Sequence, residues 1–152
     1  MRDFKKWRWL NIISIIVLNY NAGNLLIDCI SSIIDSNLKK IEIIVVDNCS
    51  SDNSHLECKK KFDSIKLIEN KENLGYCEGN NVGLKASKGE FIIILNPDTT
   101  VTSNWVSELL NAHAKFGDGL YQPKILSMSE PKKLGTTGNI VNIFGFGFSR
   151  GR

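Results

Sequence analysis

The stretch FIIILNPDTT at residues 91–100 carries an apolar run directly into a polar cluster. The run FIIIL is typical of a strand that is covered on both faces of a sheet. Asp98 follows it, flanked by Asn96, Thr99 and Thr100. A buried strand that ends at an acidic group places that charge at a sheet edge, where metal-bound phosphates can reach it. Since Asn, Pro and Asp also favour turns, the alternative is that these residues only turn the chain.

Earlier segments repeat this pattern of an apolar strand followed by polar residues. Strands are expected at residues 12–18, 41–46, 65–68 and 90–95, helices at 24–36, 51–62, 77–87 and 104–116, and a fifth strand at 119–123. This alternation predicts an α/β fold with a mostly parallel sheet. The carboxyl ends of such strands lie at one edge, where ligands bind. The polar residues at 19–21, 47–51, 73–75 and 96–100 are therefore expected to form one site.

A second carboxylate ends the strand in IEIIVVDNCSSDNS, residues 41–54. Asp47 at this position can accept a hydrogen bond from the N3–H of uracil or thymine, or from a ribose hydroxyl. The alternative is a turn residue that bonds to its own backbone. Asp52 is expected to cap the helix that follows.

The glycine-rich stretch NLGYCEGNNVG at residues 73–83 is the third candidate segment. Glycines allow the backbone to approach a phosphate or ribose closely. Their spacing matches neither the dinucleotide fingerprint nor a Walker loop, which argues against NAD and P-loop chemistry. Gly83 is expected to serve helix packing instead.

Composition excludes several classes of protein. The 152 residues are 42% hydrophobic and 23% charged, with a net charge of +3, which disfavours a disordered chain, a membrane-embedded chain and a nucleic-acid partner. The positive excess lies in the aromatic stub at residues 1–11, which either touches an anionic membrane or is a solvated tail. Widely spaced cysteines predict free thiols in the cytoplasm. His55 and His113 are expected to be ordinary surface or boundary residues.

The blocks SIIVLNYN, IEIIVVDNCSSDNS and NLGYCEGNNVGLKASKGEFIIILNPDT, with their spacing, resemble the donor half of family 2 inverting glycosyltransferases. The resemblance covers residues 13–121 and implies the three-layer GT-A fold of nucleotide-diphospho-sugar transferases. The sequence LNPDT, in place of two adjacent acids, resembles the rhamnosyltransferase-like branch that builds bacterial and archaeal surface polysaccharides. The resemblance implies a UDP- or dTDP-sugar donor, Mg²⁺ or Mn²⁺, and a glycan or lipid-linked acceptor.

The resemblance also implies roles for single residues. Asp47 matches the family aspartate that contacts the base, and Asp98 matches the metal-binding aspartate of the Asp-x-Asp motif. Asn96 stands where many members keep the first acid of that motif. Residues Leu18, Asn19 and Tyr20 match the loop that lines the base, and Asn73, Gly75 and Asn81 match the segment along the ribose and diphosphate.

The expected domain layout is a stub at residues 1–11, a nucleotide-sugar-binding domain at 12–126 and an irregular segment at 127–152. Family members continue past Arg152 with the acceptor half, including the general base that deprotonates the acceptor hydroxyl. Glu130 is the only carboxylate after Asp118 and lies in a loop-like stretch, so no catalytic residue is assigned.

Two functional hypotheses follow. The first is a glycosyltransferase-type domain that binds a nucleotide-diphospho-sugar with a divalent metal. The alternative is an inactive truncated or split-gene remnant that binds nucleotide or a partner chain only. A nucleotidyltransferase is disfavoured because LNYNAGN at residues 18–24 lacks a glycine- and lysine-rich loop.

Overall fold

The computed structural model describes residues 12–130, 134–136, 139–141 and 147–149, so the predicted basic stub lies outside the described residues. The chain forms two compact units, residues 1–103 and 104–152. This division differs from the predicted boundary between residues 126 and 127, which stays a prediction. In the first unit the elements are β1 (Ile13–Asn19), α1 (Asn24–Asp35), β2 (Ile41–Asp47), α2 (Ser54–Lys61), β3 (Lys66–Glu69), α3 (Gly75–Ala86) and β4 (Phe91–Leu95).

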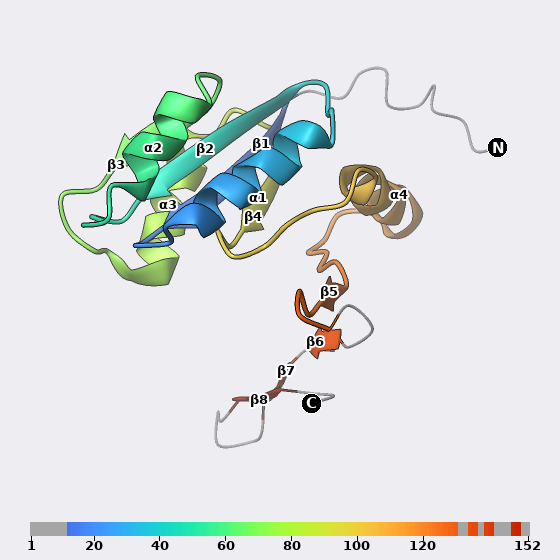
Figure 1. The fold of residues 1–152 in the computed structure, drawn as a ribbon. Coiled ribbons are helices and arrows are strands. Elements are labelled where there is room, and N and C mark those ends of the chain that lie inside the picture. Colours follow the sequence, from blue (N-terminus) through green and yellow to red (C-terminus); the bar gives the residue numbers. More distant parts are fainter. Residues whose placement is uncertain (1–11, 131–133, 137–138, 142–146, 150–152) are drawn as a thin grey trace. The chain divides into compact units, whose positions relative to one another are not determined.

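The first unit is built on a four-stranded sheet in the order β3-β2-β1-β4, with every pair parallel (Figure 1). Its register pairs Asn19 with Asp47 and Asp47 with Glu69, so three strands end level with one another. Because all four strands run in the same direction, the loops that follow them lie at one edge. The predicted parallel α/β sheet is confirmed.

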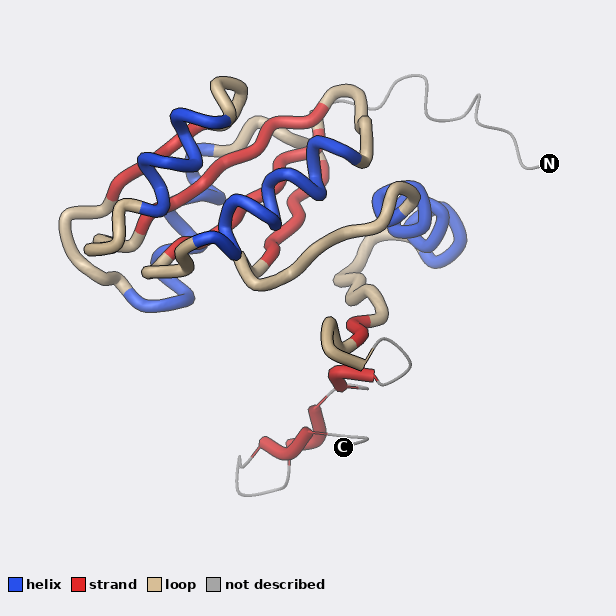
Figure 2. The backbone as a smooth tube through the Cα atoms, viewed as in Figure 1, coloured by secondary structure: helices blue, strands red, loops and turns tan. Residues whose placement is uncertain are grey.

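Helices cover the sheet on two faces, which gives three layers (Figures 1 and 2). α3 packs on β1 and β2 and covers a cluster formed by Ile16, Ile44 and Val46, while α1 and α2 pack side by side on the opposite face. Since side chains alternate along a strand, the residues of odd number in β1 and β2 point to the α1/α2 face. Asn19 and Asp47 therefore point to that face, at the ends of their strands.

Gly83 of α3 fits where a methyl group would not. A Cβ at this position would lie 2.5 Å from Cγ2 of Ile16 and 3.1 Å from Cγ2 of Val46. We expect Gly83→Ala to lower the free energy of unfolding, because overpacking costs about 1–3 kcal/mol and the gain in helix propensity is only about 0.5–1 kcal/mol. Urea denaturation measures this change.

Gly79→Ala on the same helix is the matched control. Its Cβ would meet Cδ1 of Leu18 at 2.6 Å, which is the far end of a flexible side chain that can rotate away. We expect the free energy of unfolding of this variant to fall by less than that of Gly83→Ala, because the end of the Leu18 side chain can shift more easily than the methyl groups of Ile16 and Val46 on the central strands. Equal losses in the two variants would contradict the close packing of Gly83 against the sheet.

β4 differs from the fully buried strand that the sequence predicted. Its residues are partly exposed, and Ile94 exposes 48% of its surface. β4 pairs only with β1 among the described strands, and α3 packs mainly over β1 and β2, with Ile92 of β4 at the margin of the same apolar cluster. An apolar run therefore marks a strand but does not show which of its faces are covered.

The second unit contains α4 (Trp105–Phe116), β5 (Ile125–Leu126), β6 (Leu134–Thr136), β7 (Asn139–Val141) and β8 (Gly147–Ser149). α4 ends at Gly117, as predicted, with a φ of 85° that favours glycine. The predicted strand at residues 119–123 is wrong, since this stretch has no regular structure and only the short β5 follows it. β5 pairs with β6 and β7 with β8, both antiparallel.

The four cysteines are free thiols, as predicted. Burial raises the pKa of Cys29 to about 12 and that of Cys58 to about 11, so both are neutral members of the core. Within the described part of the chain, no helix combines the length and the apolar character needed to cross a bilayer.

Candidate functional site

The segment after β4 folds into a turn that leaves one carboxylate unused. The backbone N–H of Thr99 donates to the carbonyl of Asn96 at 3.2 Å, and its hydroxyl donates to the same oxygen at 2.6 Å. Asp98 between them is exposed, and no hydrogen bond or ion pair joins it to another described residue. These residues therefore do turn the chain, and the turn presents the Asp98 carboxylate to solvent, while its metal-binding role stays a prediction.

The turn is anchored on α1. The thiol of Cys29 lies 3.7 Å from the carbonyl oxygen of Asn96, and the N–H of Val101 donates to the hydroxyl of Ser32 at 3.1 Å. These contacts hold both ends of the turn against a helix of the first unit. Asp98 is therefore an unpaired charge on an anchored segment.

The donor set at this turn fits a hard divalent cation that is shared with a ligand. No group of three or more His, Cys, Asp or Glu side chains gathers among the described residues, so none of these can enclose a metal on its own. Mg²⁺ and Mn²⁺ in phosphate sites often keep only one or two protein carboxylates, while phosphate oxygens and waters fill the other positions. Asp98 alone satisfies that requirement.

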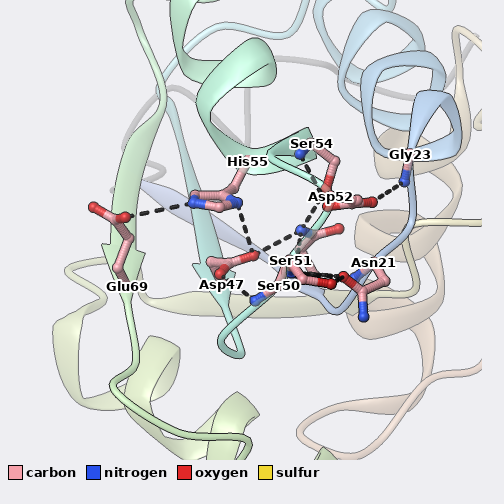
Figure 3. Close-up of polar contacts among 10 residues, drawn as sticks. Asn21, Gly23, Asp47, Ser50, Ser51, Asp52, Ser54, His55 and Glu69 are labelled. Carbon is pink, nitrogen blue, oxygen red and sulfur yellow. Dashed lines mark hydrogen bonds and ion pairs between the residues drawn. The ribbon is translucent and has the colours of Figure 1, made fainter.

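Asp47 at the end of β2 lies inside the protein. It is 2% exposed, and its Oδ1 accepts a hydrogen bond from Nδ2 of Asn19 at 2.8 Å. Its Oδ2 accepts one from the N–H of Ser50 at 2.9 Å (Figure 3). The bond to Ser50 is the turn contact that the sequence allowed as an alternative. The predicted contact with a base stays a prediction, because Asp47 is buried, although each carboxylate oxygen can accept a further hydrogen bond.

Asn19 joins the end of β1 to the loop after β2. Its Nδ2 also lies 3.1 Å from the hydroxyl oxygen of Ser50 and 2.9 Å from that of Ser54. The Ser50 oxygen in turn accepts a hydrogen bond from the N–H of Asn21 at 2.9 Å. Because Asn19 is completely buried, its amide organises the loops.

The two residues beside Asn19 differ in exposure. Leu18 packs against the apolar cluster below α3 and lies close to Gly79. Tyr20 is 53% exposed and is the part of the predicted base-lining loop that is open to solvent.

Asp52 fastens the loop after β2 to the loop after β1. Its Oδ2 accepts a hydrogen bond from the N–H of Gly23 at 2.9 Å, and its Oδ1 accepts one from the N–H of Ser54 at 3.0 Å (Figure 3). Burial raises the pKa of this carboxyl, but the hydrogen bonds from Ser54 and Gly23 outweigh it and lower the pKa below its usual value. Asn53, rather than the expected Asp52, takes the N-cap position, and the Asp52 carboxylate accepts the first helical N–H from one residue earlier.

Asn48 is a structural residue that the sequence did not single out. It is 2% exposed, its Nδ2 donates to Oδ1 of Asn73 at 2.7 Å and to the carbonyl of Gly75 at 3.2 Å, and its Oδ1 accepts from the N–H of Leu74 at 3.0 Å. Asn48 therefore holds the loop that leads into α3. Asn73 and Gly75 are exposed there, and Asn81 further along α3 is exposed and bonds to Glu78.

His55 on α2 contradicts the predicted surface or boundary position. It is 6% exposed, its Nδ1 lies 3.3 Å from Oδ1 of Asp47, and its Nε2 lies 3.4 Å from Oε1 of Glu69 (Figure 3). The first residues of α2 lie over the ends of β2 and β3, where the register places the two carboxylates in line. His55 lies far in the sequence from both Asp47 and Glu69, so the sequence pattern alone did not reveal these contacts.

The polar edge of a parallel three-layer sheet places this chain in the GT-A class of fold, and solved structures agree. S. aureus TarS 1–349 in complex with UDP aligns with a TM-score of 0.62 at 21% identity, covering 78% of this chain and 43% of that chain. The mannosyltransferase PcManGT from Pyrobaculum calidifontis, in complex with GDP-Man and Mn²⁺, aligns with a TM-score of 0.64 at 20% identity, covering 78% and 34%. At 20–21% sequence identity, this structural similarity shows the fold of the chain.

The chain belongs to glycosyl transferase family 2, whose sequence model matches residues 14–147. An uncharacterized glycosyltransferase of Haemophilus influenzae is 36% identical over 102 residues, which cover 65% of this chain and 32% of the relative. The UDP-Glc:alpha-D-GlcNAc-diphosphoundecaprenol beta-1,3-glucosyltransferase WfgD of Escherichia coli is 32% identical over 116 residues, covering 73% and 46%.

The low-salt glycan biosynthesis hexosyltransferase Agl10 of Haloferax volcanii is 31% identical over 122 residues, covering 78% of this chain and 38% of the relative. The chain thus spans less than half the length of each of these curated relatives. The predicted family and fold are confirmed, while the rhamnosyltransferase-like branch stays a prediction.

Proposed function

We propose that this chain is the donor-binding part of a glycosyltransferase and that it binds a nucleotide-diphospho-sugar together with a divalent cation. The observation that carries the proposal is the exposed, unpaired carboxylate of Asp98 on an anchored turn at the carboxyl edge of the sheet. Membership of family 2 supports it, as do the UDP complex of TarS and the GDP-Man and Mn²⁺ complex of the mannosyltransferase.

The residues of the site divide into two groups in this proposal. The exposed residues Tyr20, Asn73, Gly75, Asn81 and Asn96 are available to contact the donor, and Asp98 would hold Mg²⁺ or Mn²⁺. The bound cation would supply positive charge where the leaving diphosphate develops negative charge. The buried residues hold the loops in place instead.

The buried group consists of Asn19, Asp47 and Asn48. Asn19 and Asp47 order the loop at residues 48–53, and Asn48 orders the loop at 70–75. A site whose loops are held before the ligand arrives loses less conformational entropy on binding. We therefore assign Asp47 an organising role, beside the direct base contact that the family resemblance implies.

The acceptor in this proposal is a glycan or a lipid-linked saccharide, and the reaction takes place in the cytoplasm, where the free thiols stay reduced. The acceptor hydroxyl needs a general base, and we assign none of the described residues to that role. A partner chain that supplies the acceptor half, and contact of residues 1–11 with the membrane face, remain predictions. Membership of family 2 and the nucleotide complexes of the structural neighbours support this proposal over the alternative of an inactive remnant that binds nucleotide or a partner chain only.

Calorimetric titration of the 152-residue chain with UDP, dTDP and GDP, each with and without Mn²⁺, tests the proposal. We expect one nucleotide to bind more tightly than the others and binding to depend on the metal, because Asp98 reaches the phosphates only through a cation. Absence of binding to all three nucleotides in the presence of Mn²⁺ would contradict the proposed function.

A further inference from the structure

Three polar side chains form a row across the sheet at the proposed donor site. Asn19, Asp47 and Glu69 end β1, β2 and β3 in register, on the face that α2 covers. His55 from the first turn of α2 lies between the two carboxylates, with one ring nitrogen towards each (Figure 3). The polar network around Asp47, which holds the loop at residues 48–53, therefore includes two more ionisable groups, His55 and Glu69.

The protonation state of His55 determines whether this arrangement is favourable. A neutral imidazole has one N–H and one lone pair, so one of its nitrogens would face a carboxylate oxygen without a proton between them. Nδ1 is buried and makes no aligned hydrogen bond, although Oδ1 of Asp47 lies 3.3 Å away. An imidazolium carries a proton on both nitrogens and pairs the buried Asp47 charge, which is costly to leave uncompensated.

Among the described residues of β1, β2 and β3, the charged groups that contact His55 are Asp47 and Glu69. Asp47 faces it from β2 and Glu69 from β3, while β1 contributes the neutral Asn19. On α2 itself, Lys59 lies one turn further on and donates to the carbonyls of Asp63 and Ile65. The buried residues of α1, which packs beside α2, are apolar or, for Cys29, a neutral thiol.

We propose that His55 is a positioning residue for donor binding: as an imidazolium held between Asp47 and Glu69, it fixes the Asp47 carboxylate and with it the loop at residues 48–53. The link to the loop is direct, because Oδ2 of Asp47 accepts the hydrogen bond from the N–H of Ser50. This inference rests on the proposed donor-binding function and adds a pH dependence to it. Donor affinity is highest where His55 is protonated and falls as the pH rises.

The first test measures affinity against pH with a ligand that does not itself titrate in the range. UDP-glucose, dTDP-glucose and GDP-mannose serve as probes with Mn²⁺, because neither phosphate of a nucleotide-diphospho-sugar carries a second ionisable proton. In a series of titrations from pH 5.5 to pH 8 we expect the dissociation constant to rise by at least about tenfold, the size of one hydrogen bond to a charged group.

Two variants separate positioning from stability. His55→Gln should bind weakly across the whole range and with a flat pH profile, because glutamine carries no titrating charge. Glu69→Gln should weaken the pH dependence while leaving the fold intact, because the Glu69 side chain is 60% exposed. His113→Gln and Glu57→Gln are the matched controls on α4 and on the exposed side of α2, and both should keep the original profile.

A second readout needs no ligand. Hydrogen exchange at the Ser50 amide reports directly on its bond to Asp47, so its protection factor should fall with rising pH and should be low throughout in His55→Gln. If no nucleotide binds, the proposed function fails and this readout still tests His55. A His55→Gln chain with the original Ser50 protection and the original pH profile of affinity would overturn the inference.

Discussion

Asp98→Ala is expected to remove the metal-dependent part of nucleotide binding and to leave the fold intact. Asp98 is the one exposed carboxylate on the turn after β4, and it has no partner among the described residues. Removing a carboxylate that holds a cation should weaken nucleotide binding in the presence of Mn²⁺ by at least about tenfold. Loss of a residue that only supports a metal ligand already costs metal affinity of that order. Calorimetry with UDP, dTDP and GDP, with and without Mn²⁺, measures the loss.

Asp63→Ala is the matched control for this variant. Asp63 is also an exposed aspartate in a loop, but it precedes β3 and so lies at the opposite edge of the sheet. Both variants should unfold within about 0.5 kcal/mol of the original protein, as surface substitutions usually do. Metal-dependent binding that survives in Asp98→Ala, or that disappears equally in Asp63→Ala, would remove the basis for the proposed cation site.

Ile44→Asp is expected to unfold the first unit. Ile44 is completely buried in the cluster between the central strands and α3. An ionised carboxylate here would have no partner, at a cost of several kcal/mol, and the packing of the isoleucine side chain would also be lost. Since domains are stable by only about 5–15 kcal/mol, the loss approaches the whole stability. Circular dichroism and thermal denaturation measure the result.

Ile94→Asp places the same new charge on the same sheet at an exposed position. Ile94 lies on β4 and is 48% exposed, so its carboxylate stays hydrated and the variant should fold. Ile44→Val is the second control, with an expected cost of about 0.5–1.5 kcal/mol. A cooperative melting transition of Ile44→Asp at the original temperature would show that this cluster is not the core of the unit.

The elements of the first unit could be predicted because each carries its own local pattern. Apolar runs with β-branched residues mark β1 and β2, and the apolar stripe of α1 marks a helix that packs on them. The apolar run of β4 was equally clear, but its burial was predicted wrongly. Burial depends on which elements cover a strand, and a sequence pattern does not contain that information.

The candidate site was predicted in part, for a related reason. Asp98 was identified because a carboxylate directly after an apolar run is visible in the sequence itself. His55 and Glu69 were not, since they are 14 residues apart and become neighbours only through the register of β2 and β3. Asn48 stands beside Asp47 in the sequence, yet its partners at residues 70–75 come from another loop.

The sequence by itself determined the alternation of strands and helices, the parallel sheet and the polar residues that follow its strands, because hydrophobic periodicity and strand ends are local properties. Only the tertiary structure decided which of those polar residues are buried supports and which are open to a ligand. Strand register and helix packing bring Asn19, Asp47, His55 and Glu69 into contact, while the turn after β4 leaves Asp98 in solvent. The physical reason is that burial and charge pairing depend on distances in space between residues that the chain keeps far apart.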